Sequence, residues 1–380
     1  MSDAIEPFVL SVAQSELDEL RQRLGQTRWP ERQTVDDWDQ GVPLQDVQAL
    51  CAYWRDRYDW RRCEDMLNGF GQYRTVIDGL GIHFLHIRSP EPDALPMIMT
   101  HGWPGSVIEF SRVIGPVTDP AAHGGDPRDA FHLVLPSLPG FGFSDKPEAA
   151  GWGLERIARA WVMLMDRLGY GRYVAQGGDW GAFVTAAIGV ARPDGCIGVH
   201  LNTVNAPPRE GAAAAPDPEE RAAFALMQRY GKEEFGYAKQ MGTRPQTLGY
   251  ALSDSPAGQA AWIYEKLRGW SDSPDGPEAL FGIDAMLDNI MLYWLPNAGA
   301  SSARLYWESL GDASLSKPID LPVGATVFPY DINKSPRRWA EPHFKNIVHW
   351  NEVACGGHFG AFEQPEIFVR ELRDCFRSLR

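Results

Sequence analysis

Basic charge, cysteine and long apolar runs are all scarce in this sequence. It has 36 Lys and Arg against 50 Asp and Glu, a net charge of −14, so nucleic acid and anionic membrane surfaces are not expected partners. Its 5 cysteines show no close pair and no metal-ligand spacing, which indicates free thiols in a reducing compartment. No apolar run is long enough to span a membrane, and residues 1–12 do not read as a signal peptide. We therefore expect a cytoplasmic protein.

Residues 1–75 differ from the rest and predict a small helical module lying on a larger domain. Apolar residues recur on one helical face over 11–24, where Ser15 is placed to cap the helix. A second amphipathic helix is expected over 44–58, after an irregular stretch rich in Trp and Asp. No residue of this module is a candidate for chemistry.

From residue 72 onward, short apolar strands alternate with helices. The dipeptide Asp78-Gly79 between two such strands is a hairpin signal. This alternation predicts an α/β fold with a mostly parallel central sheet covered by helices on both faces. Strands are expected over residues 73–77, 82–87, 96–100, 131–135, 172–175 and 195–202, and helices over 154–168 and 182–191.

The alternation stops after residue 207 and resumes near residue 317. The segment between is mainly helical, with helices expected over 218–230 and 283–294. Strands at 323–328 and 347–350 and a helix from Pro365 follow it. A helical insertion between two portions of one sheet is a cap. The predicted division is therefore a module over 1–75, a core over 76–207 and 317–380, and a helical cap over 208–316.

The segment Gly177-Gly178-Asp179-Trp180-Gly181 lies between an apolar strand and a helix of small residues. Small residues around a sharp strand-to-helix turn are typical of the nucleophile position in an α/β-hydrolase fold. A carboxylate is already ionised near neutrality and suits displacement at a saturated carbon, which gives an alkyl ester. The alternative is that Asp179 merely caps the helix that follows.

Two further segments fit the same fold. The loop 101–105, HGWPG, follows a strand and can supply the backbone N–H of Trp103 to an oxyanion hole, with a second N–H from Trp180. His358 follows the last expected strand, where the order nucleophile, acid, histidine places the base that activates water. The alternatives are a simple turn with a structural histidine in the loop, and a structural or solvated His358.

A third residue should orient the imidazole of His358. Asp331 follows a strand and precedes His358 by 27 residues, so it is the preferred acid. Less well-placed or non-carboxylate alternatives are Asn202, Asn205, Glu308, Asp312 and Glu352.

Displacement of an oxygen leaving group also needs a proton donor, and cap tyrosines can serve. The residues alone leave the choice open among Tyr230, Tyr237, Tyr250, Tyr264, Tyr293 and Tyr306.

Together these segments resemble the microsomal-type epoxide hydrolases that carry an N-terminal module. The resemblance covers nearly the whole chain. Its motifs are TRWP at 27–30, YDWR at 58–61, HGWPGS at 101–106, PSLPGFGFSDKP at 136–147, GGDWG at 177–181, LSDSPAG at 252–258, NIMLYW at 289–294 and GGHFGAFEQPE at 356–366.

The resemblance implies that Asp179 is the nucleophile, His358 the base, and Tyr237 and Tyr306 the pair that binds and opens the epoxide. Such enzymes use no metal and no organic cofactor. The third acid in that family is often Glu in an FPxE segment. Here it is Asp331, one methylene shorter, so the imidazole is expected to move or ester hydrolysis to slow. Because the chain starts at the module, without the anchor of membrane-bound relatives, the resemblance also implies a soluble protein.

The expected partner is a small apolar or aromatic epoxide. The hint comes from the cap aromatics Trp262, Tyr264, Trp270, Phe281 and Trp294. A homodimer and a role in aromatic hydrocarbon catabolism, detoxification or secondary metabolism are further expectations. The rival functions are a haloalkane or haloacid dehalogenase with the same triad, and a non-catalytic protein of this fold that binds an apolar ligand.

Overall fold

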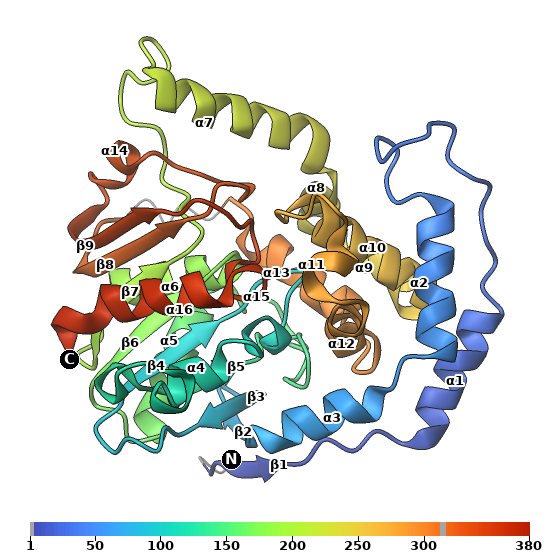
Figure 1. Cartoon of the computed structure of the whole chain (residues 1–380), viewed down its shortest axis with the longest axis horizontal. Coiled ribbons are helices and arrows are strands. Elements are labelled where there is room, and N and C mark those ends of the chain that lie inside the picture. The colour runs from blue at the N-terminus through green and yellow to red at the C-terminus, as the bar shows by residue number, and fades with distance from the viewer. Residues whose placement is uncertain (1–3, 312–316) are drawn as a thin grey trace.

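The computed structural model describes residues 4–311 and 317–380. At the centre of this part of the chain lies a nine-stranded sheet in the order β1-β2-β3-β5-β4-β6-β7-β8-β9 (Figure 1). The pairs from β5 to β9 are parallel, and those among β1, β2, β3 and β5 are antiparallel. The mostly parallel sheet expected from the sequence is therefore confirmed. The strands are β1 Glu6–Phe8, β2 Gln72–Ile77, β3 Leu80–Ile87, β4 Leu95–Thr100, β5 Phe131–Pro136, β6 Tyr173–Gly177, β7 Cys196–Leu201, β8 Ile319–Val327 and β9 Phe344–Glu352.

The hairpin expected at Asp78-Gly79 joins β2 to β3. Both residues have positive φ, 51° for Asp78 and 81° for Gly79. This backbone matches the right-handed twist of the two strands, as in the two-residue turns favoured in hairpins.

The helices cover the sheet and fill the predicted insertion. In the view of Figure 1, α4 and α16 lie in front of the strands, while α5 packs on α6 and α6 lies along β4, β6, β7 and β8. The helices are α1 Gln14–Gly25, α2 Leu44–Asp56, α3 Trp60–Gly69, α4 Ile114–Thr118, α5 Leu154–Arg167, α6 Trp180–Ala191, α7 Pro218–Arg229, α8 Gly236–Thr243, α9 Pro245–Asp254, α10 Pro256–Gly269, α11 Pro277–Phe281, α12 Ile283–Trp294, α13 Gly299–Ser309, α14 Arg337–Ala340, α15 Gly360–Glu363 and α16 Pro365–Phe376.

Helices α7 to α13 lie between β7 and β8 in the sequence, and we call them the cap helices. They occupy the segment in which a helical cap was expected. The proposed division of the chain stays a prediction, and its boundary at residue 316 falls in 312–316, outside the described residues.

The N-terminal segment departs from the predicted helical module in three ways. Residues 6–8 form β1, which pairs with β2 and extends the sheet. Helix α3, which follows Asp59 as its N-cap, was missed because its pattern merges with that of the preceding helix. Ser15 does not cap α1: the helix begins at Gln14, and its N-cap is Ala13, without a side-chain hydrogen bond.

The helices of the N-terminal segment lie against the cap helices. Figure 1 shows α1 and α2 along one edge of the molecule, beside the cap, and α10 contacts both. The buried carboxylate of Asp288 in α12 adds to this contact: the Tyr58 hydroxyl donates to it at 2.7 Å, and the partly exposed Arg62 guanidinium bonds both of its oxygens at 2.6 Å. Asp288 is only 2% exposed, so the two segments share this carboxylate.

Two sequence expectations concern the whole chain. The cysteines form no disulfide, as predicted. Among the described residues, none of the helices has the length and apolar character needed to cross a membrane.

Candidate active site

The turn between β6 and α6 holds Asp179 in an unusual backbone conformation, with φ 49° and ψ −128°. Glycines make the turn possible. A Cβ atom on Gly177 would lie 2.1 Å from the Gly181 carbonyl oxygen, and one on Gly181 would lie 1.9 Å from the carbonyl oxygen of Thr100. The Asp179 side chain makes no capping hydrogen bond to α6. The interpretation of Asp179 as an ordinary helix cap is therefore wrong, and its carboxylate is free for other contacts.

Those contacts engage both carboxylate oxygens of Asp179. The backbone N–H of Trp103 donates to Oδ1 at 2.8 Å, and His358 Nε2 lies 3.3 Å from Oδ2. The backbone N–H of Asp179 donates to the Thr203 hydroxyl at 3.1 Å, and that hydroxyl donates to Asp331 at 3.2 Å. Thr203 thus ties the turn to the predicted acid, a link that the sequence did not indicate.

His358 lies between the two carboxylates. Its Nδ1 is 2.7 Å from Asp331 Oδ1, and its backbone N–H donates to the Trp270 carbonyl at 2.8 Å. Burial acts to lower the pKa of His358, but the charge of Asp331 and the hydrogen bonds to Asp179 and Asp331 outweigh it. The pKa of His358 is therefore raised well above its usual value. The shorter side chain of Asp331 still reaches the ring, and the ring still faces Asp179.

The other candidates for the acid make contacts elsewhere. Asn202 accepts from the Gln176 amide at 2.7 Å, and Glu308 accepts from the Gly151 N–H at 2.8 Å. Asn205 is exposed. Asp312 lies outside the described residues.

The tyrosines favoured by the resemblance surround the same carboxylate. Tyr237 of α8 stacks on Trp103 with ring centroids 4.9 Å apart, and Tyr306 of α13 packs edge-on against Trp180 at 4.8 Å. The two tyrosine rings are 5.7 Å apart. The Tyr306 hydroxyl and the Trp180 indole N–H are buried without a hydrogen-bond partner among the described residues. Buried polar groups are normally paired, so these two donors are suited to a ligand.

Three of the remaining cap tyrosines have other partners or face solvent. Tyr264 bonds Glu278, and the Tyr293 hydroxyl donates to the Gly105 carbonyl at 2.6 Å. Tyr250 is 71% exposed. None of these is placed to meet a substrate at Asp179.

Comparison with known proteins identifies the family. The model described as epoxide hydrolase N terminus matches residues 5–110, and the alpha/beta hydrolase fold model matches residues 96–235. A protein of Stigmatella aurantiaca, named as a candidate epoxide hydrolase, is 57% identical over 99% of this chain and 86% of its own length. The chain belongs to the epoxide hydrolases.

Other epoxide hydrolases agree with this assignment. Epoxide hydrolase 1 of Oryctolagus cuniculus is 32% identical over 97% of this chain and 88% of its own length. The structure of the juvenile hormone epoxide hydrolase of Bombyx mori superposes with a TM-score of 0.90 at 29% identity, covering 100% of this chain and 96% of that one. The epoxide hydrolase of Aspergillus niger gives 0.88 at 33%, covering 99% and 97%. The predicted α/β-hydrolase fold is thereby confirmed, and the chain is a hydrolase.

The epoxide hydrolase site contains a carboxyl group that sequence reasoning missed. Glu109 follows the HGWPGS segment, and a Cβ atom on Gly105 would lie 1.1 Å from its Oε1, so the glycine leaves room for the carboxyl. Burial raises the pKa of Glu109 to about 8, with the charge of His358 lowering it and that of Asp179 raising it. The available signal was one acidic residue in the apolar run VIEF.

A buried lysine was missed as well. Lys266 of α10 is 3% exposed, and its ammonium lies 4.9 Å from the ring centroid of Tyr237 and 5.6 Å from that of Trp270. It pairs with Glu234 at 3.6 Å and also with Glu265. Cations over aromatic faces are stabilised by the ring quadrupole. Lys266 could not be found from the sequence, because its spacing from the other residues of the site follows no recognised motif.

The predicted cap aromatics divide into two sets. Trp262 and Trp270 lie near Trp103, with ring centroids 6.4 and 6.0 Å from it. Phe281 instead packs on Phe362, with centroids 4.9 Å apart. Of these three residues, only Trp262 and Trp270 are placed to contact a ligand beside Trp103.

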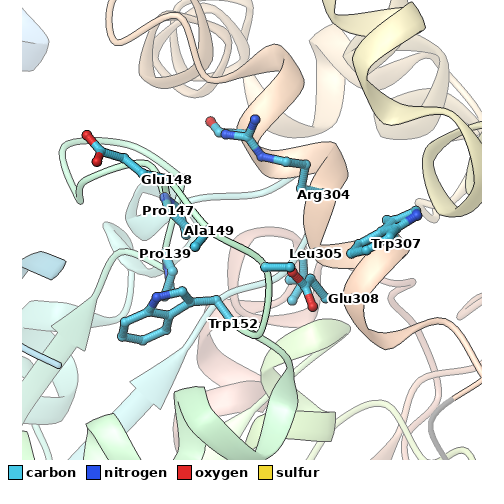
Figure 2. Close-up of a pocket in the computed structure, with 11 residues that line it drawn as sticks. Pro139, Pro147, Glu148, Ala149, Trp152, Arg304, Leu305, Trp307 and Glu308 are labelled. Carbon is cyan, nitrogen blue, oxygen red and sulfur yellow. The ribbon is translucent and has the colours of Figure 1, made fainter. Parts of the chain in front are cut away.

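Figure 2 shows a different hollow, between α13 and the loop 139–152. Its volume is about 150 Å³, and its lining includes Arg304 and Trp152 but neither Asp179 nor Tyr306. Ligand pockets usually hold roughly 300–1,000 Å³. The hollow is small for a ligand pocket, and because Asp179 and Tyr306 do not line it, it is separate from the candidate site.

Among the residues that the structure describes, no group of three or more His, Cys, Asp or Glu is arranged to hold a metal ion.

Proposed function

We propose that this chain converts an epoxide and water into a vicinal diol through a covalent alkyl ester of Asp179. The observation that carries the proposal is the set of contacts through one carboxylate: Trp103 N–H on Oδ1, and His358 on Oδ2 with Asp331 behind it. The relatives named as epoxide hydrolases support the reaction.

Ring opening uses the oxygen of Asp179 that faces His358. The phenols of Tyr237 and Tyr306 hold the epoxide oxygen while Oδ2 attacks a ring carbon. The C–O bond breaks, and a phenol protonates the alkoxide. Oδ1 stays on the Trp103 N–H and becomes the carbonyl oxygen of the ester.

Ester hydrolysis uses the contacts that His358, Asp331 and the Trp103 N–H make around the same carboxyl group. His358, oriented by Asp331, takes a proton from a water molecule that attacks the ester carbon. The oxyanion forms on Oδ1, next to the Trp103 N–H. Trp180 is the first residue of α6, so its backbone N–H lacks an acceptor within the helix and supplies the second donor. Collapse of the oxyanion breaks the bond between the carboxyl carbon and Oδ2. His358 gives its proton to Oδ2, and the diol leaves with Oδ2 as one of its oxygens.

The proposed cycle uses no metal ion and no organic cofactor, because a carboxylate, an imidazole and two phenols supply every step. The tryptophans around Tyr237 favour a bulky apolar or aromatic epoxide. A cytoplasmic location, a homodimer and a role in catabolism, detoxification or secondary metabolism stay predictions.

A dehalogenase is the second candidate, and one observation favours it. The Trp180 indole N–H is buried without a partner among the described residues, and such a donor can bind halide. Two phenols beside the nucleophile favour the epoxide instead. Halide release and diol formation, measured side by side on a haloalkane and on styrene oxide, separate the two; chloride without diol would reject the epoxide reaction.

Locating isotopic oxygen after a single turnover tests the ester. With excess enzyme in heavy-oxygen water, the first diol should carry no label, and the peptide containing Asp179 should gain it. Label in the first diol would mean direct attack by water and would contradict the proposal.

A trapped intermediate gives an independent check. His358→Gln should open the epoxide and then stop, so the intact mass should rise by the mass of the substrate. The matched control is Asp179→Asn in the His358→Gln background, verified by mass to remain Asn. It should gain nothing, and an adduct on that control would place the nucleophile elsewhere.

A further inference from the structure

A third tyrosine is hydrogen-bonded to the ring-opening pair. The hydroxyl of Tyr230 lies 2.8 Å from that of Tyr237. Tyr230 begins a single π-helical segment, Tyr230–Glu234, between α7 and α8, and the Phe235 N–H donates to its carbonyl at 2.9 Å. Such wide turns within helices recur at functional sites.

The three phenols differ in their access to water. Tyr237 and Tyr306 are 6% and 3% exposed, whereas Tyr230 is partly exposed. The π-helical segment that Tyr230 begins contributes Lys232, Glu233 and Glu234 to an open cavity of about 1110 Å³. Tyr230 is therefore the least enclosed of the three phenols, and it lies next in sequence to residues that line an open cavity.

Each phenol has one proton to donate. When Tyr237 donates to the epoxide oxygen, its own oxygen can only accept from Tyr230. Accepting that bond strengthens Tyr237 as a donor, because hydrogen bonds in a chain polarise one another. The Tyr306 hydroxyl makes no hydrogen bond of ordinary geometry among the described residues, and its polar neighbours, Tyr237 and Trp180, are buried as well. The two ring-opening phenols are thus not equivalent.

We propose that Tyr230 is a positioning residue that orients the Tyr237 proton toward the epoxide and passes its own proton to Tyr237 as the ring opens. The inference rests on the proposed function. As Asp179 attacks and the C–O bond breaks, the Tyr237 proton moves to the alkoxide. In the same step the Tyr230 proton moves to the Tyr237 oxygen. Tyr230 afterwards takes a proton from water, which leaves hydroxide in the solvent.

The Tyr230→Phe variant tests this in single-turnover ring opening, followed by tryptophan fluorescence. We expect ring opening to slow about five- to tenfold, with substrate affinity changed less than twofold. The matched control is Tyr250→Phe, the same change at an exposed cap tyrosine, which should match the wild type. A Tyr230→Phe variant that opens the ring at the wild-type rate would overturn the proposal.

Combining variants shows whether Tyr230 acts through Tyr237. Tyr230→Phe should slow ring opening in the Tyr306→Phe background but have no effect in the Tyr237→Phe background. An equal loss in both backgrounds would mean a purely structural role and would overturn the proposal. If Tyr237→Phe alone opened the ring like the wild type, the tyrosine assignment of the proposed function would fail instead.

A measurement on the wild-type enzyme tests the proton relay without depending on whether the variants fold. In mixtures of light and heavy water, the ring-opening rate of the wild type should depend on deuterium fraction along a curve, because two phenol protons move. The plot for a folded Tyr230→Phe enzyme should be straight. A straight plot for the wild type would exclude a second moving proton and overturn the relay.

Discussion

At the scale of single residues, the charge of Glu109 is set by its surroundings. Its buried carboxyl lies within the electrostatic influence of Asp179 and His358. Burial raises its pKa to about 8, so it is mostly protonated at neutral pH. It is then a hydrogen-bond donor, and the site avoids a further negative charge beside the nucleophile.

This protonation makes stability depend on pH. Because the folded state raises the pKa of Glu109 from 4.5 to about 8, its contribution is fully present below about pH 4.5 and is lost as pH rises through 8. Glu109→Gln should therefore show a smaller fall in the free energy of unfolding between pH 5 and 8.5 than the wild type. Urea unfolding at several pH values measures it. The exposed Glu31→Gln variant is the control, and equal slopes for Glu109→Gln and the wild type would contradict the expectation.

The Asp331–His358 pair gives a second residue-scale prediction. The charge of Asp331 raises the pKa of His358 and keeps the imidazole ring oriented. Asp331→Asn removes that charge, so ester hydrolysis should slow by about 10²–10⁴-fold while ring opening continues. The ester should then accumulate, as seen by intact mass.

The control keeps the charge. Asp331→Glu adds only one methylene and should retain most of the hydrolysis rate. A large loss in Asp331→Glu would show that the short side chain, and not only its charge, sets the position of the ring.

Much of the site followed from order along the chain. Asp179, Trp103, Asp331 and His358 each follow a strand, in an order that the fold dictates, so the sequence could predict that they meet. Thr203, Glu109 and Lys266 could not be predicted in this way. They act through contacts between segments whose spacing in the sequence has no periodicity.

At the scale of elements, the turn that carries Asp179 depends on close backbone approach. A Cβ atom on Gly181 would lie 1.9 Å from the Thr100 carbonyl oxygen of β4, so α6 and β4 must separate to admit it. Gly181→Ala should lower the free energy of unfolding by about 2–4 kcal/mol, measured by urea unfolding. Gly171→Ala, whose Cβ would meet nothing within 4 Å, is the matched control. Equal stability of the two variants would refute the close-approach argument.

The elements themselves were mostly predictable, since buried parallel strands are short apolar runs and amphipathic helices repeat every three to four residues. β1 was missed because three residues carry no alternation to detect. α3 has its buried residues at helical spacing, but only three residues separate it from α2, so the two patterns run together.

At the scale of the whole molecule, Asp288 links the N-terminal segment to the active-site loop. Its helix, α12, also carries Asn289, which donates to the Pro104 carbonyl at 2.8 Å, and Tyr293, which donates to the Gly105 carbonyl. The loop held in this way presents the Trp103 N–H to Asp179. The partners of Asp288 lie 226 and 230 residues away in the sequence, which is why no local pattern predicted them.

Asp288→Asn should weaken this link. It leaves the buried Tyr58 hydroxyl and the partly exposed Arg62 guanidinium facing a neutral amide, at an expected cost of about 1–3 kcal/mol in the free energy of unfolding. The control is Asp284→Asn in the same helix, where a partly exposed carboxylate accepts from Tyr53 at 3.0 Å and the cost should stay below about 1 kcal/mol. Similar losses for both variants, by thermal or urea unfolding, would show that the buried link is not special.

The 3.3 Å contact between His358 and Asp179 has a consequence for the total charge of the site. In the free enzyme, the pKa of His358 is raised well above its usual value, which favours the imidazolium between the carboxylates of Asp179 and Asp331. With His358 in that form, the three groups carry one net negative charge. When Asp179 becomes an ester it loses its charge, and His358 loses one of the two anions that held its proton. Once the imidazole has released its proton to the solvent, as it must before it can take one from water, Asp331 alone again leaves one net negative charge. In the proposed cycle the free enzyme and the ester therefore carry the same net charge, so the buried site does not have to hold an additional unpaired charge between the two half-reactions.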